Sequence, residues 1–104
     1  MTDLKKLQKE IYQNKVNKGF NITDINKEFC LTYGEVAEAY EAWRKKQTDV
    51  GEEIADVVIY LLGLSEILNV DLENEILKKV NKNKHRQYKI IDGVNTRVKE
   101  YGEE

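Results

Sequence analysis

The hydrophobic positions recur at intervals of three or four residues along most of the chain, which is the spacing of amphipathic helices. A first helix is predicted over about residues 4–17, because Gly19 follows it. A second helix is predicted to begin after an N-cap at Thr23 or Asp24 and to end at about Lys46. Five residues form the apolar side of this second helix: Ile25, Phe29, Val36, Tyr40 and Trp43.

Two further helices are predicted behind the second. Asp49 starts the third, with Glu52 three positions later in the arrangement of a capping box, and this helix ends near Asn69. Asp71 then caps a fourth helix. Four helices joined by short connections predict an all-α fold, a four-helix bundle-like arrangement of antiparallel helical hairpins.

The C-terminal segment departs from the helical pattern. Asp92 and Gly93 form a turn signal that fits either a short hairpin or an irregular tail. We therefore expect a single helical domain over residues 1–104, with its core at about 4–89 and a short tail or turn at 90–104.

Composition and charge narrow the class of protein. The 104 residues include no proline, and 35% are charged while 40% are hydrophobic, which suits a helical globular domain. A formal charge of −2 predicts no attraction to nucleic acid polymers or to anionic membranes. Cys30 is the only cysteine, so no internal disulfide forms, and we expect a cytoplasmic protein without a targeting or membrane-spanning segment.

The most apolar stretch of the chain, residues 51–64, contains two acids. On a helix Glu53, Asp56 and Tyr60 fall on one stripe together with Gly63. A buried carboxylate without a partner is costly, so both acids need a compensating group. Two interpretations stay open: a core helix whose acids reach a helix end or a cationic side chain, and one wall of a metal site.

The second helix offers a matching set of acids. Glu35, Glu38 and Glu41 are spaced by three residues, which is typical of a solvated acidic face unless a cation lies between them. A short connection makes the second and third helices antiparallel neighbours, so both sets are able to project into one space. Carboxylates without histidine or cysteine suit Mg²⁺, with Mn²⁺ as an alternative.

Three segments carry a family resemblance: Leu31-Thr32-Tyr33-Gly34-Glu35-Val36-Ala37-Glu38-Ala39, then the run from Gly51 to Leu62, then Lys79-Val80-Asn81-Lys82-Asn83-Lys84-His85-Arg86. With these motifs the chain resembles the MazG-like all-α nucleoside triphosphate pyrophosphohydrolases, which include the dCTP pyrophosphatases. The resemblance implies Mg²⁺-dependent hydrolysis of a (deoxy)nucleoside triphosphate to the monophosphate and pyrophosphate. It also implies a homodimer or a homotetramer.

The resemblance implies four metal ligands, Glu35, Glu38, Glu53 and Asp56. Glu53 and Asp56 match the family's Glu-x-x-Asp pair, and Glu35 matches the second glutamate of its Glu-x-x-Glu pair. Thr32 stands where the first glutamate of that pair is expected. Either Glu38 takes over the missing ligation, or the site holds one carboxylate fewer.

The remaining roles follow from the same resemblance. Glu35 or Glu38 is expected to orient or deprotonate the attacking water. Four residues are expected to bind the substrate: Tyr60, Lys79, Asn83 and Arg86. The plainer interpretations are a core position for Tyr60 and a surface position for Asn83, while Trp43 is expected in the core or in a subunit interface. Because of Thr32, the alternative function is a regulatory protein that binds nucleotide and metal without turnover; a third possibility is a helical interaction module with solvated acids.

Overall fold

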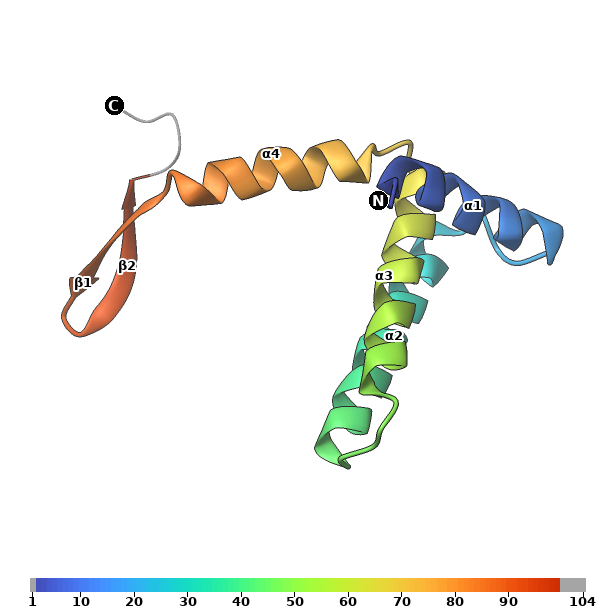
Figure 1. Cartoon of the computed structure of the whole chain (residues 1–104), viewed down its shortest axis with the longest axis horizontal. Coiled ribbons are helices and arrows are strands. Elements are labelled where there is room, and N and C mark those ends of the chain that lie inside the picture. The colour runs from blue at the N-terminus through green and yellow to red at the C-terminus, as the bar shows by residue number, and fades with distance from the viewer. Residues whose placement is uncertain (1, 100–104) are drawn as a thin grey trace. The chain divides into compact units, whose positions relative to one another are not determined.

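A computed structural model describes residues 2–99, and the four predicted helices are confirmed. They are α1 (Leu4–Asn17), α2 (Ile25–Arg44), α3 (Val50–Ile67) and α4 (Leu72–Lys84), followed by the strands β1 (Gln87–Ile91) and β2 (Val94–Lys99) (Figure 1). Among the described residues no helix is both long enough and apolar enough to cross a membrane.

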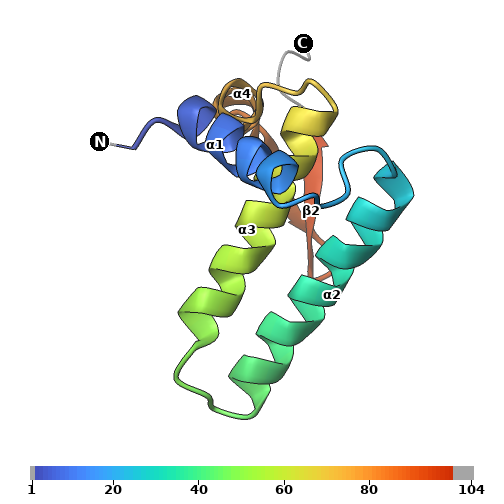
Figure 2. The ribbon, with the colours of Figure 1, turned by 90° about the vertical axis from the view of Figure 1, so that its right-hand side faces the viewer.

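The chain divides into two compact units, Met1–Leu72 and Glu73–Glu104. In the first unit α2 and α3 lie side by side and antiparallel, and α1 packs across α3 (Figure 2). The second unit holds most of α4 and the β1–β2 hairpin. The predicted carboxylates of the site all lie in the first unit.

Aspartate side chains cap the starts of α1 and α2 but not that of α3. Asp3 accepts a hydrogen bond from the backbone N–H of Lys6 and Asp24 accepts one from Lys27, at 3.1 Å and 3.0 Å. Asp49 precedes α3 but makes no such bond, so the predicted capping box is wrong in this detail. The physical reason is its backbone: Asp49 has ψ 17°, whereas a capping side chain needs the extended conformation that Asp24 adopts.

The C-terminal segment forms the hairpin rather than the irregular tail, as far as it is described. β1 and β2 pair antiparallel, with Ile91 opposite Val94. Asp92 and Gly93 connect them with φ of 52° and 79°, the two positive values that a tight hairpin turn requires. Residues 100–104 of the predicted tail lie outside the described range.

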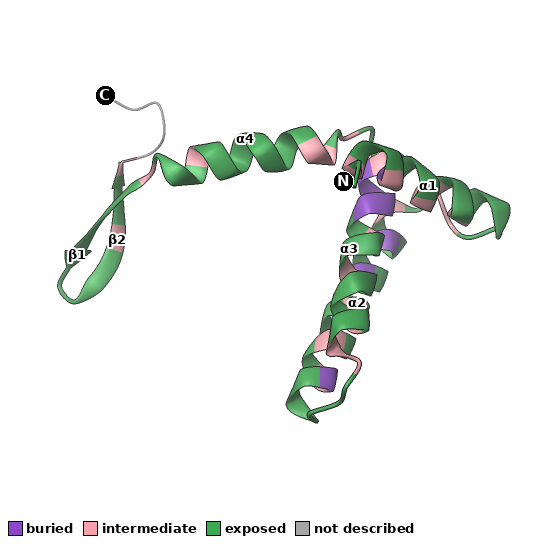
Figure 3. Cartoon of the chain, in the orientation of Figure 1, coloured by how far each residue is buried: buried purple, intermediate pink, exposed green. Residues whose placement is uncertain are grey.

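The core of the first unit lies where α1 crosses α3 beside α2 (Figure 3). Of the buried hydrophobic residues of the described chain, Leu62 and Leu64 flank Gly63 on α3, whereas Ala42 lies in the last turn of α2. Gly63 makes this crossing close: a Cβ there would lie 3.3 Å from Cδ of Lys15. Gly34, by contrast, faces open space, so a close helix contact does not explain that glycine.

Candidate metal centre

Three acids from two helices converge on one point of the first unit. Glu35 and Glu38 lie one turn apart on α2, and Glu53 lies on the facing side of α3. Each offers one carboxylate oxygen, and these oxygens all lie within 4.8 Å of one another. Three hard oxygen donors without nitrogen or sulfur form the donor set that Mg²⁺ and Mn²⁺ prefer.

The electrostatics of this cluster leave room for a positive charge. One oxygen of Glu35 and one of Glu53, Oε2 in each case, are buried without a hydrogen-bond partner. Burial raises the pKa of Glu35, and the charges of Glu38 and Asp56 raise it further. Burial also raises the pKa of Glu53, with contributions from Asp49 and Glu38. The unpartnered oxygens and the mutual repulsion fit a divalent cation between these carboxylates.

Asp56 and Thr32 do not belong to this group of three acids. Asp56 is exposed and outside the group within 4.8 Å, but its charge is near enough to raise the pKa of both Glu35 and Glu53. Thr32 is 7% exposed, and its hydroxyl donates to the backbone carbonyl oxygen of Glu28 at 2.8 Å. The Thr32 hydroxyl is therefore used in a hydrogen bond to the backbone of the preceding helical turn, which is common for threonine in helices. The carboxylate that lies beside Glu35 is that of Glu38.

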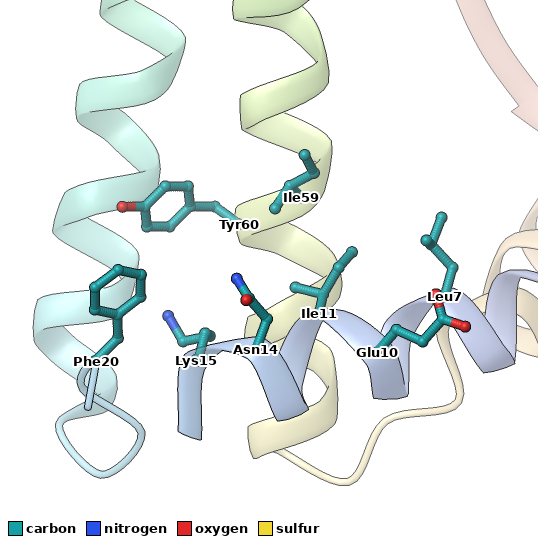
Figure 4. A pocket seen from close by; sticks show the side chains of 8 residues that line it. All are labelled: Leu7, Glu10, Ile11, Asn14, Lys15, Phe20, Ile59 and Tyr60. Atoms are coloured by element: carbon teal, nitrogen blue, oxygen red, sulfur yellow. The ribbon is translucent and has the colours of Figure 1, made fainter. Parts of the chain in front are cut away.

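A cavity of about 360 Å³ lies between α1 and α3 (Figure 4). Its walls are mostly apolar, with two aromatic rings and polar groups at the edge; it is lined by Leu7, Glu10, Ile11, Asn14, Lys15, Phe20, Ile59 and Tyr60. Tyr60 reaches from α3 towards α2. Burial raises the pKa of its hydroxyl, and the negative charges of Glu35 and Glu28 raise it further.

An ion pair that involves Lys15 of this cavity was not predicted from the sequence. Lys15 of α1 donates to the carboxylate of Glu28 on α2, and the two side chains are 13% and 3% exposed. The Lys15 ammonium also lies 5.4 Å from the centre of the Tyr60 ring, within cation–π range. One signal was available: Glu28 precedes Thr32 by four residues and Glu35 by seven, which places it on the same side of α2.

The other predicted substrate-binding residues belong to the second unit. Lys79 and Asn83 are exposed on α4, and Arg86 is half-buried in the connection to β1. Their role stays a prediction. Trp43, expected in the core or in a subunit interface, is 65% exposed in α2. The core position is therefore wrong for Trp43 in the described chain.

The raised pKa values give a pH-dependent prediction for the metal-free protein. Above the ordinary carboxyl pKa of 4.5 the folded chain retains protons on Glu35 and Glu53 that the unfolded chain has lost. The free energy of unfolding therefore falls as the pH rises through this window. Glu35→Gln removes one of the repelling charges, so with EDTA at about pH 7 its Tm is expected to exceed that of the parent by a few degrees.

Thermal unfolding followed by circular dichroism between about pH 4 and about pH 8 checks this expectation. The difference in Tm between Glu35→Gln and the parent should vanish at the acidic end of this pH range. It should change sign when Mg²⁺ is added. Glu10→Gln, the loss of an exposed acid of α1, is the matched control. An equal Tm for parent and Glu35→Gln at every pH would contradict the repulsion described above.

Comparison with known proteins gives one match. A model of the MazG-like family matches residues 27–103, which include most of α2 and all of α3, α4 and the hairpin. No curated protein and no solved structure matches the chain. The matched range contains Glu35, Glu38, Glu53 and Asp56, and it begins after α1 and the cavity-lining residues of that helix.

Proposed function

Because the chain belongs to the MazG-like family, we propose that it hydrolyses a (deoxy)nucleoside triphosphate to the monophosphate and pyrophosphate. The observation that carries this proposal is the convergence of Glu35, Glu38 and Glu53 within 4.8 Å, with buried carboxylate oxygens that no protein group satisfies. These three residues would hold Mg²⁺ or Mn²⁺, and Asp56 is the nearby fourth ligand. Glu38 then takes the place of the family glutamate that is absent at position 32, where this chain has Thr32.

The bound cation supplies charge neutralisation on the phosphate oxygens of the substrate. The chain itself supplies the acceptor for the proton of the attacking water. Glu35 is proposed for this role, and Glu38 is the alternative. The water oxygen forms a bond to the α-phosphorus. The bond from the α-phosphorus to the oxygen that bridges to the β-phosphate breaks, and pyrophosphate leaves with that oxygen.

The cavity beside Tyr60 supports a nucleotide rather than a simple phosphate ester as the substrate. Its apolar and aromatic walls suit a base and a sugar, and the hydroxyl of its Tyr60 is near enough to Glu35 for that carboxylate to raise its pKa. Lys79, Asn83 and Arg86 are proposed to bind the substrate as well, with Arg86 as a two-pronged phosphate ligand. Nucleic acid polymers and membranes are not proposed as partners, and the cytoplasm is the proposed location.

A panel of common dNTPs and NTPs tests the proposal. With Mg²⁺ or Mn²⁺ we expect release of pyrophosphate from at least one of them, and none in EDTA. The products should be a nucleoside monophosphate and pyrophosphate in equal amounts, without free inorganic phosphate. The proposal fails if no triphosphate in the panel is cleaved with either metal ion.

A second candidate function is binding of a metal–nucleotide complex without turnover. Thr32 favours it, because a hydroxyl that is bonded to the helix backbone replaces a carboxylate expected in the family. Isothermal titration calorimetry separates the two functions. A regulatory binding protein gives a stable binding isotherm and intact nucleotide afterwards, whereas an enzyme gives continuing heat and monophosphate.

A further inference from the structure

Tyr60 lines two cavities of the first unit. One is the cavity of about 360 Å³ between α1 and α3, and the other, of about 320 Å³, is bordered by the α1–α2 connection and the first turns of α2. Three side chains line both cavities: Lys15, Phe20 and Tyr60 (Figure 4). Because the Tyr60 ring borders open space in both cavities, close packing alone does not fix its orientation.

Lys15 supplies a contact that does constrain the ring. Its ammonium lies over the ring of Tyr60, 5.4 Å from the ring centre, where a cation is attracted by the π electrons. This attraction is stronger where water is excluded, and the Lys15 side chain is only 13% exposed. Lys15 belongs to α1 and Tyr60 to α3, so the contact joins two helices at the border of both cavities.

Lys15 is itself held in place by α2 and α3. Its ammonium donates to the carboxylate of Glu28 on α2, a side chain that is 3% exposed. Its aliphatic stem passes α3 at Gly63, where an added Cβ would lie 3.3 Å from Cδ of Lys15. A free lysine side chain has many rotamers to lose when a ligand orders it, but here both the stem and the ammonium are constrained. The position of the cation is therefore set before a ligand binds.

We propose that Lys15 is a positioning residue for the nucleotide: anchored by Glu28, its cation holds the Tyr60 ring in the orientation that forms a wall for the base and the sugar. The inference rests on the proposed function, in which the cavity takes the nucleoside part of the substrate. A preorganised wall avoids the cost of ordering the ring on binding. In the described chain the ion pair of Lys15 goes to Glu28 rather than to the acids of the metal centre, so its loss should raise KM and leave kcat nearly unchanged.

The double variant Lys15→Met/Glu28→Met tests this role. It removes the cation together with its anion, so the net charge stays the same and neither charge is left buried without a partner. With the dNTP or NTP that the parent cleaves best, we expect KM to rise at least about tenfold and kcat to change by less than about threefold. The Ki of inorganic triphosphate should stay within about threefold of the parent value, because that ion has no base or sugar to lie against Tyr60.

Two further variants show whether Lys15 acts through Tyr60. Tyr60→Leu should raise KM by a similar factor, and adding it to the double variant should raise KM no further, because both changes remove the same wall. Lys9→Met removes an exposed lysine of α1 that lines neither cavity, and it should keep the KM of the parent. A double variant with the KM of the parent overturns the inference. A double variant in which KM and Ki rise together also overturns it, since that result indicates a general disturbance of the site.

Glu28→Gln keeps the test decisive if circular dichroism shows that the double variant does not fold. Glutamine has the size of glutamate and still accepts a hydrogen bond from Lys15, but the charge that anchors the ammonium is gone. KM should then rise at least about threefold at an unchanged Ki, and an unchanged KM overturns the inference.

A parent that cleaves no triphosphate disproves the proposed function but not the role of Lys15. Calorimetric titration with a Mn²⁺–nucleotide complex then provides the test, and the double variant should bind this complex at least about tenfold more weakly than the parent. Equal affinities, or a parent that binds no nucleotide, overturn the inference.

Discussion

Replacing Glu53 with glutamine is expected to lower the rate of metal-dependent pyrophosphate release by about 100-fold or more. Glu53 is the contribution of α3 to the three acids within 4.8 Å, so its loss leaves Asp56, which is exposed and outside that group, as the proposed ligand from α3. Glutamine keeps the size of the side chain but removes the negative charge that attracts a divalent cation. The affinity for Mn²⁺ should fall together with the rate, and both are measurable on the same preparation.

Glu52→Gln is the matched control for this experiment. It removes the same charge from the neighbouring residue of α3, which is exposed and outside the trio. We expect a change of less than about threefold in both measurements, because an exposed charge is screened by solvent. For Asp56→Asn we expect losses of rate and of Mn²⁺ affinity that lie between those of Glu53→Gln and Glu52→Gln. If Glu53→Gln and Glu52→Gln bind Mn²⁺ equally well, the candidate metal centre is wrong.

Replacing Lys15 with methionine is expected to lower the free energy of unfolding by about 3 kcal/mol. The change leaves the carboxylate of Glu28 buried without its cation, and that side chain is 3% exposed. Methionine retains the aliphatic packing against Gly63, so the loss reports the charge rather than a cavity. Urea unfolding at a fixed protein concentration gives the value.

The double variant Lys15→Met/Glu28→Met should recover most of this loss, because two apolar side chains often replace a buried ion pair without cost. Lys5→Met is the exposed control. Lys5 lies 3.2 Å from Asp71, but the two side chains are 56% and 45% exposed, so its loss should cost less than about 1 kcal/mol. A double variant no more stable than Lys15→Met would show that Glu28 does not depend on Lys15.

The helices of this chain could be predicted from the sequence because their signals are local. Hydrophobic spacing gave the extent of each helix, and Asp24 supplied a start signal that the structure uses. The capping box at Asp49 failed because a cap depends on the backbone angles of one residue. The shared faces of Glu35 with Glu38 and of Glu53 with Asp56 likewise follow from helical periodicity, which places residues three apart on one side.

The sequence by itself therefore determined the helical elements, the acidic motifs and the family resemblance. Only the tertiary structure decided which surfaces meet. It paired Lys15 with Glu28 from different helices, brought Glu38 to Glu53, buried the Thr32 hydroxyl, and left Trp43 exposed. The physical reason is that periodicity defines the faces of a helix, whereas the face that turns inward is selected by packing between segments far apart in the chain.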